Sequence, residues 1–178
     1  MKKRIQCGYV QVYTGDGKGK TTAALGLAMR AVGHGFRVYM VQFMKGQIFY
    51  GELAAAGKLY PNFVIKQAGR PDFVNPEKPE KIDIKMAKNA LKHSEKVVSS
   101  GKYDIVILDE INVAVKFNLL NVNDVLKLIK IKPSHVELIL TGRYADPKIL
   151  KAADLVTEMR LLKHYYNKGI MAREGIER

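Results

Sequence analysis

The sequence predicts an α/β domain of three layers, with a mostly parallel β-sheet covered by helices on both faces. Strand-like and helix-like segments alternate along the chain, which is the pattern of successive βαβ units. One segment, 103–108, is short and continuously apolar from Ile105, as expected of a strand buried on both faces of a parallel sheet. The 178 residues, 47% of them hydrophobic, are enough for one such domain, 1–178.

The strands are predicted from short runs rich in β-branched and aromatic residues. The first run ends at a glycine-rich loop, and the second is dense in Val, Tyr, Met and Phe. The third run, Phe63-Val64-Ile65, is the weakest. The predicted strands cover residues 9–13, 37–44, 63–65, 103–108, 136–140 and 155–161.

The helices are predicted from apolar residues at helical spacing and from residues that start or end helices. Gly33-His34-Gly35 ends the first helix, and Ser100-Gly101 ends the second. Asn121 lies near the start of the third, and Pro147 occupies the first turn of the last. The predicted helices cover 20–32, 80–100, 122–131 and 146–153, and the proline-rich segment 71–79 is predicted to be an irregular loop.

The loop after the first strand matches the phosphate-binding pattern G-x-x-x-x-G-K-[ST], except that Thr14 replaces the first glycine. Its remaining glycines allow backbone N–H groups to turn inward around an anion. Lys20 adds a positive charge, and the hydroxyl of Thr21 suits Mg²⁺ at the positive end of the next helix. We therefore predict a nucleotide triphosphate site, with MgATP as the expected ligand. The predicted nucleotide-binding residues of the loop are Thr14, Gly15, Asp16, Gly17, Lys18, Gly19, Lys20, Thr21 and Thr22.

Two other polar segments follow predicted strands and should lie at the same edge of the sheet, because parallel strands all end there. Asp109 and Glu110 follow the apolar strand; either one can hold Mg²⁺ or act as a base that activates water. Arg143 follows the next strand. It is a candidate for phosphate contact, the alternative being a structural salt bridge with Asp146.

Charge and composition limit the classes of partner. A net charge of +13 attracts polyanions, but Lys and Arg are scattered and no nucleic-acid-binding motif accompanies them. We therefore do not expect nucleic acid as the partner; an acidic protein or an anionic substrate explains the charge equally well. No apolar run approaches the roughly 20 residues of a transmembrane helix, and no secretory signal is visible. The expected location is the cytoplasm, and the single cysteine, Cys7, excludes an internal disulfide.

Several motifs, taken in order, resemble those of the P-loop ATP:corrinoid adenosyltransferases, which make adenosylcobalamin. The resemblance covers nearly the whole chain and includes the missing first glycine of the loop. It departs from the family at Tyr165, where proline is usual, at Arg178, where an aromatic residue is common, and in having no tryptophan. The motifs that carry it are 10–22, 33–35, 41–46, 107–112, 140–143, 153–159 and 169–177.

The resemblance implies a RecA-like P-loop NTPase fold, commonly a homodimer, that transfers the 5′-deoxyadenosyl group of ATP to cobalt(I) and releases triphosphate. It implies Lys20 and Glu110 as catalytic residues, with Thr21, Asp109 and Glu110 as Mg²⁺ ligands. An acidic electron donor such as flavodoxin would dock on the basic exterior. Candidate contacts to the corrinoid are Phe43, Lys45, Phe49 and Phe73, with Tyr50 beside them.

The alternative function is that of a RecA-like ATPase acting on nucleic acid, in which Glu110 activates water. The two functions differ in their products. The transferase forms triphosphate and a cobalt–carbon bond, whereas the ATPase forms ADP and phosphate.

Overall fold

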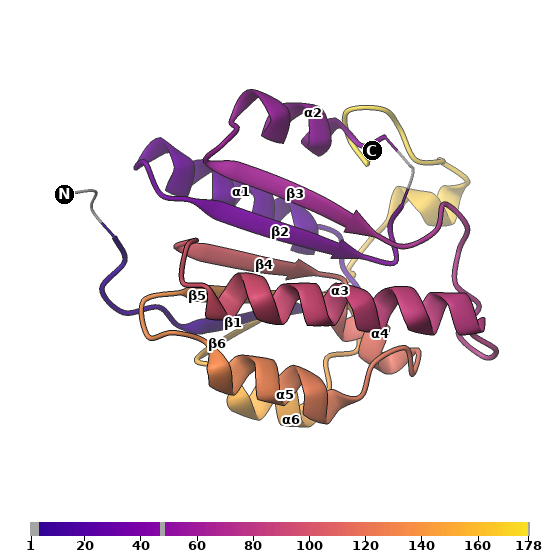
Figure 1. The fold of residues 1–178 in the computed structure, drawn as a ribbon. Helices are drawn as coiled ribbons and strands as arrows, with labels where there is room; N and C mark the ends of the chain where they lie inside the picture. Colours follow the sequence, from indigo (N-terminus) through magenta and orange to yellow (C-terminus); the bar gives the residue numbers. More distant parts are fainter. Residues whose placement is uncertain (1–3, 47–48, 178) are drawn as a thin grey trace.

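Six strands form one sheet in the computed structural model, which describes residues 4–46 and 49–177 (Figure 1). Their order in the sheet is β3-β2-β4-β5-β1-β6, and every neighbouring pair is parallel. The predicted parallel sheet is therefore confirmed. The strands are β1 (Val10–Thr14), β2 (Val38–Phe43), β3 (Phe63–Ala68), β4 (Ile105–Asp109), β5 (Glu137–Thr141) and β6 (Leu155–Glu158).

Helices cover both faces of this sheet, as predicted (Figure 1). On one face lie α1 (Lys20–Gly33) and α2 (Gly51–Lys58). On the other face lie α3 (Lys81–Ser99), α4 (Ile111–Lys116), α5 (Val122–Ile131) and α6 (Pro147–Ala152). The 3₁₀ turn η1 (Tyr165–Lys168) belongs to the C-terminal segment. In Figure 1 this yellow segment lies at the end of the sheet toward which the strand arrows point.

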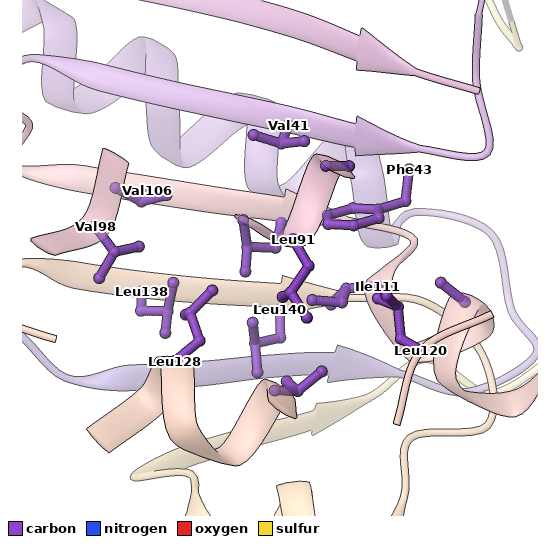
Figure 2. Packing of buried hydrophobic residues seen from close by; sticks show 14 of the residues in the cluster. Val41, Phe43, Leu91, Val98, Val106, Ile111, Leu120, Leu128, Leu138 and Leu140 are labelled. Atoms are coloured by element: carbon purple, nitrogen blue, oxygen red, sulfur yellow. The ribbon is translucent and has the colours of Figure 1, made fainter. Parts of the chain in front are cut away.

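The alternation of side chains along β4 divides the core into two layers. Ile105 and Ile107 pack with α1, whereas Val106 and Leu108 pack with the helices of the opposite face. Figure 2 shows the larger layer, in which Leu138 and Leu128 meet between the sheet and α5. These four side chains are almost inaccessible to solvent, which explains why this part of the strand is a continuous apolar run.

Some elements were missed by the pattern analysis. Two helices, α2 and α4, and the turn η1 had no prediction. α2 contains Gly51 and Gly57, both weak helix formers, and α4 has six residues. Four of those six, 111–114, are buried, so tertiary packing supports the helix. β3 continues to Ala68 beyond its predicted end, and β6 ends at Glu158, short of residue 161.

Within residues 4–46 and 49–177, no helix is both long enough and apolar enough to cross a bilayer.

His93 on α3 gives a testable dependence of stability on pH. Its ring nitrogen Nε2 lies 2.8 Å from the hydroxyl of Tyr39 on β2. Burial lowers the pKa of His93 below its ordinary value of 6.5, and Lys66 and Lys96 lower it further. Below about pH 6.5 the unfolded chain therefore binds a proton that the folded chain resists, so stability falls as pH falls. We expect His93→Gln to lose less stability than wild type between about pH 7 and about pH 5. Urea unfolding at the two pH values measures this, and equal losses would contradict it.

Candidate active site

The phosphate loop joins β1 to α1 and rests on the segment that follows β6. The amide of Gly17 donates a hydrogen bond of 2.7 Å to the carbonyl of Met159. A Cβ at Gly15 would lie 2.4 Å from that same carbonyl oxygen, and one at Gly17 would lie 2.7 Å from it. Gly15 and Gly19 have φ of 92° and 121°, which side-chain-bearing residues rarely adopt. Backbone contact and dihedral angle together explain why the loop is rich in glycine.

Lys20 lies across this loop. Its ammonium donates hydrogen bonds of 2.7 Å to the carbonyls of Gly15 and Gly17. The side chain is 7% exposed. Burial lowers the pKa of Lys20, and the nearby Glu110 partly offsets this effect. Its charge is thus placed at the start of α1, where the helix N-terminus also favours an anion.

Asp109, at the end of β4, is completely buried and connects three parts of the site. Its Oδ1 accepts hydrogen bonds from the hydroxyls of Thr21, at 2.8 Å, and Thr141, at 2.7 Å. Its Oδ2 contacts the ammonium of Lys45 at 3.0 Å. Burial lowers the pKa of Lys45, but the carboxylates of Asp109, Glu110 and Glu52 together outweigh this effect and raise that pKa. Lys45 is therefore held as a cation beside a buried anion.

Glu110 faces the open side of the site. It has a left-handed backbone with φ of 62° and begins α4. Its amide donates to the hydroxyl of Thr141 at 3.0 Å. Burial raises the pKa of the Glu110 carboxyl, and the neighbouring Asp109 raises it further. The two adjacent acids therefore have different positions, Asp109 within the wall and Glu110 on the cavity.

A cavity of about 510 Å³ opens beside the loop, within the size range of small-molecule sites. Residues 17–22 of the loop line this cavity, whereas Thr14, Gly15 and Asp16 do not. The cationic side chains of its wall come from separate segments and carry the charge that a polyphosphate requires. These are Lys18, Lys20, Lys45 and Arg143.

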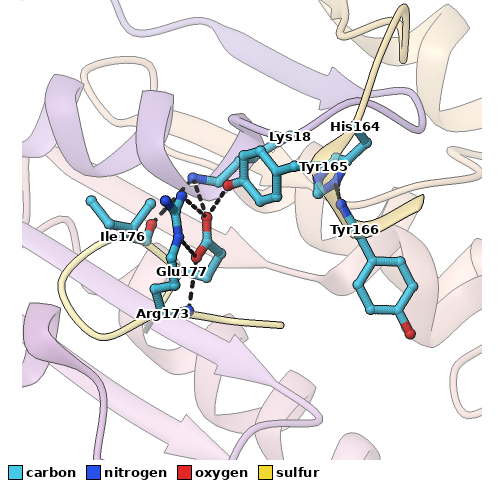
Figure 3. A network of polar contacts seen from close by, with 7 residues as sticks. All are labelled: Lys18, His164, Tyr165, Tyr166, Arg173, Ile176 and Glu177. Atoms are coloured by element: carbon cyan, nitrogen blue, oxygen red, sulfur yellow. Dashed lines mark hydrogen bonds and ion pairs between the residues drawn. The ribbon is translucent and has the colours of Figure 1, made fainter. Parts of the chain in front are cut away.

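The C-terminal segment forms another wall of this cavity (Figure 3). Glu177 accepts hydrogen bonds from the hydroxyl of Tyr165 and, at 2.9 Å, from the amide of Arg173. It also lies 3.4 Å from the ammonium of Lys18, which bonds the carbonyl of Ile176 at 3.2 Å. These contacts, above all the one from Tyr165, lower the pKa of Glu177 to about 2. The phosphate loop thus contacts the end of the chain.

The other predicted residues are spread between the site and the core. Arg143 lines the cavity and, within the described chain, forms no ion pair with Asp146. Phe43, predicted to contact corrinoid, has no exposed surface and packs in the larger core layer instead. Phe49 and Phe73 are exposed, at 74% and 103%.

Several cavity residues were not predicted. They are Leu25, Gly51, Glu52, His164, Gly175, Ile176 and Glu177. The last three belong to the motif 169–177, so that motif was the available signal for a role of the tail.

The comparisons with known proteins agree with these features. The family model of ATP:corrinoid adenosyltransferases (BtuR/CobO/CobP) matches residues 6–178. The chain belongs to this family. The corrinoid adenosyltransferase of Pseudomonas aeruginosa is 37% identical over 98% of the chain and 85% of its own length. That of Escherichia coli K12 is 36% identical over 96% of the chain and 85% of its own length.

The protein is accordingly an ATP:corrinoid adenosyltransferase, an enzyme of cobalamin synthesis or salvage. Its fold is also found in RecA-like and KaiC-like proteins. The RadB recombinase superposes with a TM-score of 0.57 over 89% of this chain and 77% of its own, at 14% identity. The flagellar accessory protein FlaH from Methanocaldococcus jannaschii gives 0.58 over 88% and 75%, at 16% identity. At such identities the likeness concerns the fold alone.

The packing of the phosphate loop on Met159 can be tested at Gly17. A methyl group there meets backbone oxygens of Met159 and Arg160 at 2.7 and 2.8 Å, so Gly17→Ala must displace the loop. We expect a Kd for MgATP at least about tenfold higher, measured by isothermal titration. Gly26→Ala is the matched control, because a Cβ at that position in α1 meets nothing within 4 Å. This control should keep its ATP affinity and gain about 0.5–1 kcal/mol of stability. Unchanged affinity in Gly17→Ala would contradict the role of this contact.

Proposed function

We propose that the cavity binds ATP by its triphosphate and that the phosphate loop stabilises this triphosphate as the leaving group of adenosyl transfer. The observation that carries the proposal is the ring of four cationic side chains around one cavity, with loop amides and the start of α1 beside them. Two of these cations belong to the loop, one follows β2 and one follows β5, and all four line the same cavity. Such a set matches a polyanion.

The reaction explains why this environment is sufficient. Cobalt(I) supplies an electron pair that forms the cobalt–carbon bond to C5′ of ATP. The C5′–O bond breaks, and its electron pair leaves on the triphosphate oxygen, which gains negative charge. Because cobalt is the nucleophile, the protein needs no base to activate one. Its tasks are to hold C5′ in line with cobalt and to stabilise the charge on the leaving group. Loop amides and Lys20 perform the second task.

The residues around Thr21 fit the Mg²⁺ that usually accompanies ATP. The hydroxyl of Thr21 and the carboxylate of Asp109, joined by a 2.8 Å hydrogen bond, offer the hard oxygen ligands that Mg²⁺ prefers. In the described chain no three His, Cys, Asp or Glu side chains gather into a metal site, so phosphate oxygens would complete the coordination. Glu110, on the cavity side, is the remaining proposed metal ligand and catalytic group. Mg²⁺ would supply further neutralisation of triphosphate charge.

We place the corrinoid at the mouth of the cavity. Tyr50 lines the cavity, and the neighbouring Phe49 ring is 74% exposed. Phe73 lies in the loop after β3, whose end is at the same edge of the sheet. An apolar surface of this kind would exclude water from cobalt and so ease its reduction. Phe43 is left out of the proposed surface, because core packing accounts for its burial.

The proposed chemistry is tested at Lys20. With MgATP and chemically reduced corrinoid, wild type should release triphosphate and form a light-sensitive cobalt–carbon bond. Lys20→Ala should lower this rate by at least about 100-fold, because it removes a preorganised charge from the leaving group. The exposed Lys127, paired with Asp124 on α5, gives the control Lys127→Ala with the same change in net charge.

The product assay also separates the two functions. Release of ADP and phosphate with no change in the corrinoid spectrum, or stimulation of hydrolysis by DNA or RNA, would favour the ATPase alternative. Full turnover of Lys20→Ala would remove the loop from the mechanism.

Electron supply is the remaining part of the proposal. The net charge of +13 suits an acidic donor such as a flavodoxin, guided by complementary charge. The rate of cobalt reduction by flavodoxin should then fall as salt rises from about 0.01 M to about 0.15 M, where screening shortens the range of surface charges. A rate independent of salt would contradict charge-guided docking. The expected homodimer stays a prediction, which sedimentation equilibrium would test.

A further inference from the structure

Lys45 has a position that its predicted contact with corrinoid does not explain. Its ammonium contacts Oδ2 of Asp109 at 3.0 Å, and the residue lines the cavity. Oδ1 of the same carboxylate accepts a hydrogen bond of 2.8 Å from the hydroxyl of Thr21, the proposed Mg²⁺ ligand. Lys45 and Thr21 therefore share one carboxylate, although Lys45 follows β2 and Thr21 follows β1, which are not neighbours in the sheet. Both residues also line the same cavity.

The ammonium is also available to a ligand. Its side chain is 20% exposed and forms part of the cavity wall. Among residues 4–46 and 49–177, the structure gives it one hydrogen bond, to Asp109, so two of its three N–H groups are not used there. The ammonium also lies over the ring of Tyr50, 5.3 Å from the ring centroid, in a cation–π contact.

Lys20 and Lys45 approach the cavity from opposite sides of Asp109. Lys20 comes from the loop after β1 and rests on the carbonyls of Gly15 and Gly17, whereas Lys45 follows β2, which β4 and β5 separate from β1 in the sheet. A triphosphate bound to the loop beside Thr21 would thus lie between two cations. This arrangement distributes positive charge along a ligand whose negative charge is itself distributed over three phosphates.

We propose that Lys45 is a catalytic residue that binds the triphosphate of ATP, with Asp109 as the residue that positions it. The inference rests on the proposed function, because it assumes the triphosphate in the phosphate loop. It assigns Lys45, one of the four cations of the cavity, to the leaving group beside Lys20 and removes it from the corrinoid surface. When the C5′–O bond breaks, Lys45 stabilises the electron pair that the triphosphate receives.

The test compares Lys45→Met with wild type in two binding measurements. The first is the Kd for inorganic triphosphate with Mg²⁺, by isothermal titration, and the second is the KM for the corrinoid. We expect triphosphate binding to weaken by about tenfold or more, as for a lost charge-assisted hydrogen bond, with the corrinoid KM unchanged. Lys45→Arg keeps the charge and should recover part of the affinity. Lys127→Met, remote from the cavity on α5, controls for net charge.

The opposite result identifies a corrinoid contact: a raised corrinoid KM with unchanged triphosphate affinity would overturn the inference. Lys45→Met also leaves a buried carboxylate unpaired, which can prevent folding. In that case Asp109→Asn is compared with the double variant Asp109→Asn, Lys45→Met, in which no unpaired carboxylate remains. Equal triphosphate affinities of these two variants would likewise overturn it.

Lys20→Ala distinguishes this inference from the proposed function. If triphosphate binding is insensitive to both Lys20→Ala and Lys45→Met, the phosphate-loop site itself is refuted. If Lys20→Ala weakens binding and Lys45→Met does not, the role of the loop stands and the role of Lys45 fails.

Discussion

The buried carboxylate of Asp109 is the interaction on which the geometry of the site depends. A carboxylate without exposed surface is stable only when charge and hydrogen bonds compensate its removal from water. Here three groups do so: the hydroxyls of Thr21 and Thr141 and the ammonium of Lys45. Each belongs to a different segment, respectively the start of α1, the end of β5 and the loop after β2. Satisfying one buried charge therefore fixes the relative positions of three parts of the nucleotide site.

A second constraint acts on the loop from the end of the chain. The loop approaches the backbone at Met159 so closely that side chains at Gly15 and Gly17 are excluded. Beyond Met159 the chain returns to the cavity, and Glu177 contacts Lys18. The loop therefore packs on the segment after β6 and also contacts the C-terminal segment. Both supports are made of residues that belong to family motifs, 153–159 and 169–177, so these motifs and the loop form one structural unit.

Much of this arrangement could be predicted because it follows from strand periodicity and parallel topology. Asp109 and the segment 140–143 were expected at one edge of the sheet, and the hydrogen bond from the hydroxyl of Thr141 to Asp109 shows that they meet. Phe43 was harder, because all six residues of β2 are buried, and a strand buried on both faces has no alternation to show which side chains point to the core. The contact of Lys18 with Ile176 spans 158 positions, and no local pattern encodes a pairing of that range.

The same phosphate loop can serve transfer as well as hydrolysis. An ATPase must create its nucleophile from water, whereas an adenosyltransferase receives a nucleophile with its second substrate. Phosphate binding is common to both reactions, so the residues of the loop cannot distinguish them. The raised pKa of Glu110 does not distinguish them either, since its causes, burial and the neighbouring Asp109, are the same for both reactions. What differs is the surface that meets the second substrate, and we propose that it is formed by residues outside the loop, Phe49, Tyr50 and Phe73. The order of motifs along the whole chain therefore identifies the family, whereas the loop alone indicates only that a nucleotide binds.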